Sequence, residues 1–326
     1  MRRLFRYLRF GLLMVMAIAL ITACQNSSST SSTTPSDCRM VRHAAGETCV
    51  PLQPTRIVAL DSVTLEFLTA LGIKPVGAPI SDGFATRLQQ DWTGVEDLGA
   101  TGEPSLEKAL ALQPDLIVGG DYYQKVYSQA SQIAPTLLFK SEHSGQWKEV
   151  FMTVAQMLGK TEAAEQVMAD YDARLAELQQ QMGDRLSQTQ VSVVRVYPDY
   201  INLYLQDSFC GKVLQDAGLP RPEAQAIAAD KASQLFDNPI QVSISREVLH
   251  QADGDVMFVW TGENTPEAKH QADQKLNELS ADPLWQQLKA VKQGKVYRVP
   301  NYWIGSGPIA ANLVIDDLFK YLVERA

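Results

Sequence analysis

Short apolar runs alternate with amphipathic stretches along most of this 326-residue chain, and such alternation predicts an α/β fold. In the first half, strands are expected at residues 56–60, 75–78 and 115–119, helices at 63–71 and 125–133, and a further apolar run lies at 136–139. The order strand, helix, strand implies parallel pairing. In the second half, strands are expected at 191–197, 201–205, 255–260 and 295–299, with helices near 212–217, 246–251, 274–280, 283–291 and 309–324.

The pattern changes between residues 147 and 185, where apolar positions recur with the 3.6-residue period of a helix. After a break at Gly159, residues 163–182 contain hardly any helix breaker, so one helix could run the length of the protein and join two lobes. The predicted domains are an N-terminal α/β lobe at 51–158, a linking helix at 159–188 and a C-terminal α/β lobe at 189–326.

Residues 1–23 have the pattern of a secretion signal. Four arginines precede an apolar run at 10–23, which is shorter than the about 20 residues that a membrane-spanning helix needs. The run ends in the tripeptide ITA before Cys24, and this resembles the bacterial lipobox, in which such a cysteine is diacylated and becomes the mature N-terminus. We therefore expect a lipoprotein signal peptide at 1–23, a lipid on Cys24, and a protein held at the periplasmic side of the cell envelope by that lipid alone.

Residues 25–37 are almost entirely Ser, Thr, Asn and Pro, which bury too little apolar surface to offset ordering entropy, so they predict a flexible tether. Cys38 and Cys49 flank a short polar stretch, and in an oxidising compartment they suit a disulfide. Closing so small a loop stabilises by about 3 kcal/mol at most. Cys210 is left over and is interpreted as a buried apolar residue. Residues 24–50 are thus expected to form a tether and a disulfide-bonded hairpin.

The formal net charge of −8 becomes about −12 when the four arginines of the signal are removed. Because no cluster of Lys or Arg follows Arg9, nucleic acid is excluded as a partner. Direct capture of zinc or manganese would need several converging histidines, and the chain has four, spread along the sequence. Catalytic motifs are absent, and residues 305–307 (GSG) read as a cap and loop before the last helix. We expect a binding protein and not an enzyme.

A weak internal sequence repeat relates the two halves. In each copy a Ser opens a helix, a Glu follows it by two positions, and an Asp eight positions further begins a strand. If each Ser is an N-cap, each Glu lies in a first helical turn, where the backbone N–H groups and the helix dipole favour a carboxylate. Helix capping explains the presence of either Glu alone. One such Glu in each lobe also suits a pair of exposed carboxylates on the same edge of the protein. The copies are Ser105, Glu107 and Asp115, and Ser245, Glu247 and Asp255.

Five sequence blocks resemble the periplasmic binding proteins of ferric-siderophore and cobalamin importers, and they occur in the order found in that family. The resemblance extends from about Pro51 to the C-terminus. It implies two Rossmann-like lobes joined by one rigid long helix (the class III, helical-backbone type), with the ligand held in a shallow cleft. It further implies a monomer whose lobes dock to arginines of an ABC importer permease through Glu107 and Glu247. The blocks are residues 56–60, 99–107, 113–120, 282–288 and 294–299.

Family members contact their ligand through loops at the carboxyl ends of strands, which is also where open α/β sheets generally bind. A ferric siderophore is large, partly aromatic or amide-rich and commonly anionic, so aromatic walls with one or two arginines suit it. Phe236 and Tyr204 are weaker candidates. Some hydroxamate-binding members carry an arginine where this chain has residues 100–102 (ATG), which disfavours a hydroxamate and leaves Arg195 as the main cation. The candidate ligand-binding residues are Asp61, Tyr122, Tyr123, Arg195, Trp260 and Trp303.

The sequence therefore predicts a solute-binding lipoprotein that captures a ferric siderophore and delivers it to an ABC importer permease, without a directly bound metal. Other readings stay open at this point. Haem is one, because Tyr122 or Tyr123 could be an axial ligand, and cobalamin fits the same fold. An envelope enzyme is a third reading, because the abundant Asp and Glu could hide a carboxylate pair.

Overall fold

The computed structural model describes residues 38–81, 83, 85–261 and 265–324. The predicted signal peptide, Cys24 and the tether therefore lie outside the described residues. The described residues from Arg39 onward form one compact unit. The first element is a two-stranded sheet of β1 (Cys38–His43) and β2 (Gly46–Pro51). Cys38 and Cys49 are each disulfide-bonded, and Cys210 is a buried free cysteine.

The N-terminal lobe is a five-stranded parallel sheet in the order β5-β4-β3-β6-β7. Its strands are β3 (Ile57–Ala59), β4 (Gly77–Ala78), β5 (Glu96–Asp97), β6 (Leu116–Gly120) and β7 (Thr136–Phe139). The central strands are buried on both faces, which explains why their sequences are continuous apolar runs. The helices and turns are α2 (Ser62–Ala70), η2 (Ala85–Leu88), α3 (Leu106–Ala111), η3 (Asp121–Val126) and α4 (Tyr127–Ile133).

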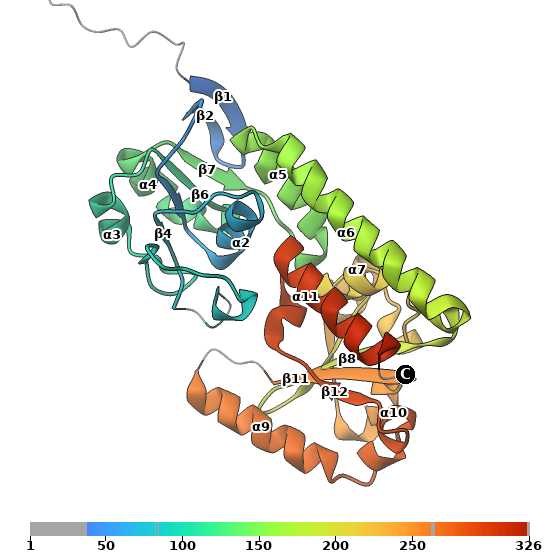
Figure 1. Ribbon diagram of the computed structural model, residues 1–326. Helices are drawn as coiled ribbons and strands as arrows, with labels where there is room; N and C mark the ends of the chain where they lie inside the picture. Colours follow the sequence, from blue (N-terminus) through green and yellow to red (C-terminus); the bar gives the residue numbers. More distant parts are fainter. Residues whose placement is uncertain (1–37, 82, 84, 262–264, 325–326) are drawn as a thin grey trace, which may run out of the picture. The chain divides into compact units, whose positions relative to one another are not determined.

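Two consecutive helices connect the lobes and pack against each other (Figure 1). Helix α5 (Trp147–Leu158) follows the short turn η4 (Ser144–Gln146), and it ends at Gly159, whose φ of 68° is the left-handed conformation that glycine adopts without strain. Helix α6 (Thr161–Met182) is the long helix, and the short turn η5 (Gly183–Gln188) follows it.

The connection between the lobes involves more than the long helix. Trp147, at the start of α5, is buried against Tyr171 of α6 and Phe209 of the C-terminal lobe, with ring centroids 5.3 and 6.0 Å away. Leu88, from the N-terminal half of the chain, belongs to the same apolar core. Segments from both halves therefore share one core beside the long helix.

The C-terminal lobe has a mixed five-stranded sheet in the order β10-β9-β8-β11-β12. Its strands are β8 (Val191–Val196), β9 (Ile201–Tyr204), β10 (Gln241–Ile244), β11 (Val256–Trp260) and β12 (Val296–Arg298). Strand β9 runs antiparallel to both β8 and β10, whereas β11 pairs parallel with β8 and β12. The reason for the direction of β9 is the short connection from β8, closed by a hydrogen bond from Tyr197 N to Tyr200 O (2.9 Å), since a parallel crossover needs a dozen or more residues.

Helices and short turns surround this second sheet. Residues 283–291, expected as one helix, form a turn, η8, and a short helix, α10. The elements are α7 (Phe209–Asp216), η6 (Glu223–Gln225), α8 (Ala229–Phe236), η7 (Arg246–Ala252), α9 (Pro266–Ser280), η8 (Trp285–Gln287), α10 (Lys289–Lys292), η9 (Asn301–Ile304), α11 (Pro308–Leu318) and the π-helical turn η10 (Phe319–Val323). Among the described residues, none of these helices is both long and apolar enough to cross a bilayer.

The internal sequence repeat corresponds to equivalent hydrogen bonds in the two lobes. Asp115, just before β6, accepts backbone N–H bonds from Thr55 (2.7 Å) and Arg56 (2.9 Å), at the entry to β3. Asp255, just before β11, accepts one from Gln190 (2.8 Å), at the entry to β8. Each Asp thus fixes the start of the central strand of its own sheet.

Candidate ligand site

The carboxyl ends of β3 and β6 are held together by Asp61. One carboxylate oxygen accepts a hydrogen bond from Thr64 N (2.6 Å), which caps α2, and the other accepts one from Gly120 N (3.0 Å). Asp61 is fully buried, and burial raises the pKa of its carboxyl group, opposed by these hydrogen bonds and by one to Tyr122. We therefore revise the expectation that Asp61 contacts a ligand, because its side chain positions the loop instead.

Tyr122 and Tyr123 follow β6 with ring centroids 4.5 Å apart, but their environments differ. Tyr123 is buried, and its hydroxyl donates to Leu60 O (2.7 Å) and accepts from Gly102 N (2.9 Å). Tyr123 is therefore a structural residue of this strand end rather than the ligand contact predicted from the sequence. Tyr122 is 54% exposed, and its hydroxyl shares a hydrogen bond with Asp61. Of the two tyrosines, Tyr122 is the one with an accessible side chain.

At the corresponding edge of the second sheet, Arg195 of β8 and Trp260 of β11 are partners in register. The Arg195 guanidinium lies 4.1 Å from the centre of the Tyr197 ring, and its Nη1 donates to the Tyr204 hydroxyl at 3.4 Å. Trp260 is almost fully buried, with its ring centroid 5.0 Å from that of Tyr204. Arg195 and Trp260 thus belong to one cluster, in which Tyr204 links the two.

Two tyrosines in this cluster were not predicted from the sequence. Tyr197 stacks on Tyr200 with centroids 4.2 Å apart, and Tyr200 is 44% exposed. Burial, and then the neighbouring Tyr204, raise the pKa of the Tyr197 hydroxyl, which favours the neutral phenol beside Arg195. The sequence did indicate Tyr197, because Arg195 and Tyr197 are two positions apart and side chains two positions apart on a strand lie on the same face.

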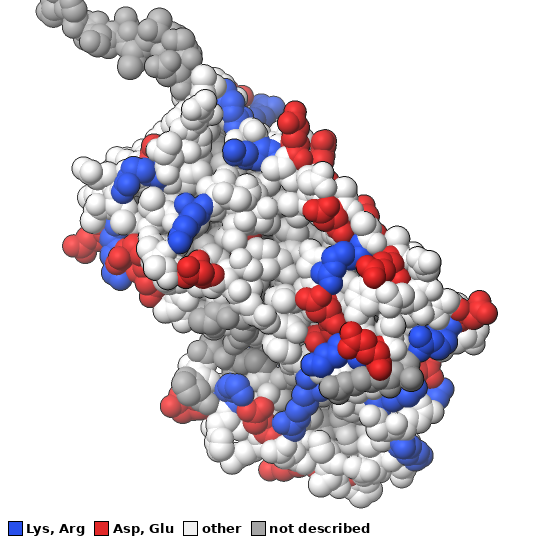
Figure 2. All heavy atoms as spheres, viewed as in Figure 1, with Lys and Arg blue, Asp and Glu red and all other residues white. Residues whose placement is uncertain are grey.

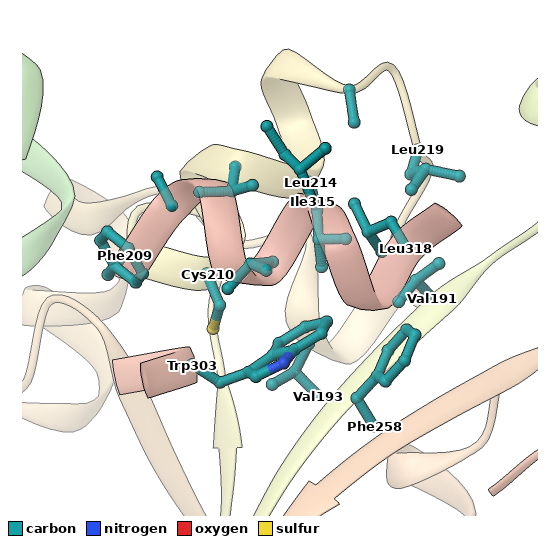
Figure 3. Close-up of a cluster of buried hydrophobic side chains, with 14 of the residues drawn as sticks. Val191, Val193, Phe209, Cys210, Leu214, Leu219, Phe258, Trp303, Ile315 and Leu318 are labelled. Carbon is teal, nitrogen blue, oxygen red and sulfur yellow. The ribbon is translucent and has the colours of Figure 1, made fainter. Parts of the chain in front are cut away.

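Trp303 lies in the core, so the prediction that it lines the ligand cleft is not supported by its position. Its ring stacks on Phe258 with centroids 4.3 Å apart, and its Nε1 donates to Asp317 Oδ2 (2.8 Å). Figure 3 shows Trp303 and Phe258 beside the residues Ile315 and Leu318 of α11. The tryptophan is fully buried because the turn η9 directs it toward α11.

Glu107 and Glu247, the predicted docking residues, are both exposed. Ser105 caps α3 by accepting a hydrogen bond from Lys108 N (3.2 Å), which places Glu107 in the first turn as expected. The second copy differs, because Ser245 makes no side-chain cap and η7 is a 3₁₀ helix with a kink at Val248. The Ser245 side chain instead hydrogen-bonds the Glu247 carboxylate, which lowers the pKa of Glu247.

The side chains at the carboxyl ends of the two sheets are suited to ligand binding. Within the part of the chain that the structure describes, no group of three or more His, Cys, Asp or Glu side chains could hold a metal ion. On the face drawn in Figure 2, acidic and basic side chains are interspersed, and the basic ones do not gather into a patch. The cation and aromatic groups of the C-terminal edge instead suit an anionic organic molecule.

Two α/β lobes joined by a long helix, with polar and aromatic side chains at the carboxyl ends of both sheets, define a two-lobed solute-binding protein of the helical-backbone class. The sequence model of the family described as "Periplasmic binding protein" matches residues 57–302. The chain therefore belongs to the periplasmic binding protein family.

Known proteins with similar sequences and structures agree with this assignment. The chain is 36% identical to the probable siderophore-binding lipoprotein YfiY of Bacillus subtilis over 95% of its own length and 96% of that protein. It is 27% identical to the achromobactin-binding periplasmic protein of Dickeya dadantii, over 82% of this chain and 86% of that protein. The crystal structure of Staphylococcus aureus SirA complexed with staphyloferrin B superposes with a TM-score of 0.73 at 26% identity, covering 87% of this chain and 98% of that one.

Proposed function

We propose that this protein captures a ferric siderophore at the carboxyl edges of its two sheets and delivers it to the permease of an ABC importer. The observation that carries the proposal is the Arg195 cluster, found in a chain that resembles a probable siderophore-binding lipoprotein over almost its whole length. Arg195, braced by Tyr197 and Tyr204, presents a fixed cation at the strand edge. A ferric complex with carboxylate or phenolate donors carries negative charge that such a cation would pair with.

Aromatic surface supplements the charge. Tyr122 on the N-terminal lobe and Tyr200 on the C-terminal lobe are about half exposed, and each gives a flat apolar face with a polar tip. Phe236, at the end of α8, is also exposed at 37%. These rings provide contact area for the aromatic or aliphatic arms of a chelator, whereas the arginine supplies charge pairing.

Haem is a weaker candidate ligand. Axial ligation of ferric haem by tyrosine uses the phenolate, but burial and the Asp61 carboxylate raise the pKa of Tyr122, which opposes its ionisation. The Tyr123 hydroxyl is already engaged by Leu60 and Gly102 and is buried. Neither tyrosine is thus prepared to coordinate iron directly, in keeping with a ligand that brings its iron fully chelated.

Delivery would use the exposed Glu107 and Glu247, one on each lobe, as contacts for basic groups of the permease. Relatives described as lipoproteins, such as a putative ABC transporter substrate-binding lipoprotein of Bacillus subtilis, support an anchor on Cys24. The folded protein would then work at the periplasmic side of the envelope, attached by its lipid and the tether at 25–37. Mass spectrometry of the protein isolated from membranes, before and after hydrolysis of its acyl chains, tests the modification of Cys24.

Titration of intrinsic tryptophan fluorescence tests ligand capture. Ferric citrate, ferric enterobactin and ferrioxamine B represent carboxylate, catecholate and hydroxamate chelates, and their gallium complexes control for absorption by iron. We expect saturable quenching with at least one of the first two complexes, accompanied by weaker binding of ferrioxamine B. If none of the three ferric complexes binds while haem or cobalamin does, the ligand assignment is wrong.

A further inference from the structure

A buried glutamate joins helices of the two lobes. Glu66 lies on α2 of the N-terminal lobe and is fully buried, and its Oε1 accepts a hydrogen bond from Ala310 N (2.8 Å) in the first turn of α11. Helix α11 follows the last strand of the C-terminal lobe, and α2 and α11 are in contact (Figure 1). One carboxylate therefore bridges elements separated by more than half of the sequence.

The start of α11 needs this carboxylate because its own sequence provides no cap. Its N-cap residue is Gly307, which has no side chain to accept a hydrogen bond. The first backbone N–H groups of a helix lack intrahelical partners, and they favour a negative charge. Glu66 fills this role from another lobe, so residues 305–307 form a loop whose cap comes from elsewhere in the fold.

The contact is also sterically specific. A Cβ atom added to Gly307 would lie 2.6 Å from Glu66 Cδ, which is closer than such atoms can approach. The φ of Gly307 is −158°, an extended conformation that any residue can adopt, so its backbone does not require glycine. A larger residue at position 307 would therefore require the Glu66 side chain to move.

No basic side chain is among the described contacts of Glu66. Burial raises the pKa of its carboxyl group from 4.5 to about 7, opposed by hydrogen bonds from the backbone N–H groups of Ala310, Ile309 and Ser306. The ionisable groups on the neighbouring helices are engaged elsewhere. Asp61 caps the start of α2, Asp317 accepts from Tyr302 and Trp303, and Asp316 pairs with Arg174.

Helix α2 also connects Glu66 to the ligand edge, since it begins at Asp61, which binds Gly120 N and the Tyr122 hydroxyl. We propose that Glu66 is a positioning residue: by capping α11 from α2, it fixes the placement of the N-terminal ligand edge relative to the C-terminal lobe. A ligand that contacts both edges then binds a preset arrangement and avoids the cost of ordering it. The effect on affinity rests on the proposed function, whereas the cap itself does not.

Three substitutions distinguish the loss of the α11 cap from a general loss of protein stability. Glu66→Ala removes the acceptor, Gly307→Ala displaces it, and Glu66→Gln keeps an amide oxygen that accepts the same hydrogen bond from Ala310. Tyr171→Phe is the matched control, because it removes a partly buried hydrogen bond to Asp216 of α7 (2.9 Å) and keeps the ring that packs in the core. Hydrogen exchange of the peptide covering residues 305–315 is measured for each variant, together with the affinity for ferric citrate and ferric enterobactin.

We expect Glu66→Ala and Gly307→Ala to speed exchange at 309–310 by about tenfold or more, because the capping acceptor is lost or moved. Both should weaken binding of the preferred ferric chelate by about tenfold, within the usual range of coupling between distant sites. Glu66→Gln should stay within about twofold of wild type in both measurements, and Tyr171→Phe should leave exchange at 305–315 unchanged.

The outcomes distinguish the two proposals. Faster exchange with unchanged affinity would overturn the positioning role while leaving the cap, and unchanged exchange in Glu66→Ala would overturn both. If wild-type protein binds no ferric chelate, the proposed function fails, yet hydrogen exchange still tests the cap. Should Glu66→Ala fail to fold, Gly307→Ala carries the same test with the carboxylate retained.

Discussion

Arg195 of β8 and Trp260 of β11 are register partners at the point where their parallel strands end. Tyr204, from the antiparallel strand β9, touches both, through its hydroxyl to Arg195 Nη1 (3.4 Å) and through its ring to Trp260 (5.0 Å). Three strands thus converge on one cation, whose direction is fixed by aromatic side chains. A ligand anion that reaches this edge meets a preorganised partner.

Replacement of Arg195 by Gln should weaken binding of an anionic ferric chelate by about 2 kcal/mol, because a charge-assisted hydrogen bond is lost. Ferrioxamine B, which is not anionic, should lose much less. Fluorescence titration of each complex measures both effects. The control is Arg298→Gln, since Arg298 ends β12 on the same sheet and contacts Asn277 (2.7 Å). Equal losses for all chelates would argue against charge pairing.

Charge reversal at both Glu107 and Glu247 should abolish uptake of the ferric chelate and leave its binding to the isolated protein intact. Both side chains are exposed, so the change does not disturb the core. Uptake of radioactive iron by cells carrying the importer is the measurement. A double reversal at the exposed Glu162 and Glu278 is the control for net charge. Uptake at the wild-type rate in the Glu107 and Glu247 variant would discard the docking assignment.

Trp303→Phe should lower the free energy of unfolding by about 1–3 kcal/mol and leave ligand affinity unchanged. The substitution removes the indole N–H that donates to the buried Asp317 and leaves the hydrogen bond from the Tyr302 hydroxyl (2.8 Å) in place. Urea denaturation measures the stability and fluorescence titration the affinity. A large loss of affinity in a stable Trp303→Phe variant would restore this residue to the ligand site.

The sequence predicted the architecture well because its signals are local and repeated. Buried parallel strands require continuous apolar runs, and a long helix requires a stretch without breakers, so β3, β6 and α6 were recognisable. The antiparallel direction of β9 follows from its short connection to β8, since a parallel crossover needs a dozen or more residues. The 3₁₀ form of η7 was not predicted, because Ser245 bonds Glu247 and leaves the helix without a side-chain cap.

The candidate site was harder to predict because position along a strand does not give side-chain direction in the following turn. Asp61, Tyr123 and Trp303 follow strands as expected, yet each points inward to a hydrogen-bond partner. Arg195 was predicted as a ligand contact because a charged residue inside an apolar strand is costly unless it is paired. Glu66 was overlooked because its partner, the N-terminus of α11, lies in the other half of the sequence and has no distinctive side chain.

Stability should depend on pH through Glu66. Its pKa is raised from 4.5 to about 7 in the folded protein, so between these values the folded state retains a proton that the unfolded state has lost. The contribution of Glu66 to stability is therefore fully present below pH 4.5, decreases as pH rises, and is lost above about 7; its full size is about 3 kcal/mol.

Glu66→Gln removes this titration, so the difference in unfolding free energy between pH 5 and pH 8 should be smaller in the variant by about 2–3 kcal/mol. Urea denaturation of both proteins at the two pH values measures it, and titrations of all other groups cancel in the comparison. The exposed Glu162→Gln variant should behave as wild type. The same pH dependence in Glu66→Gln and wild type would mean that Glu66 titrates near its ordinary pKa, and that its carboxylate is not held dry against α11.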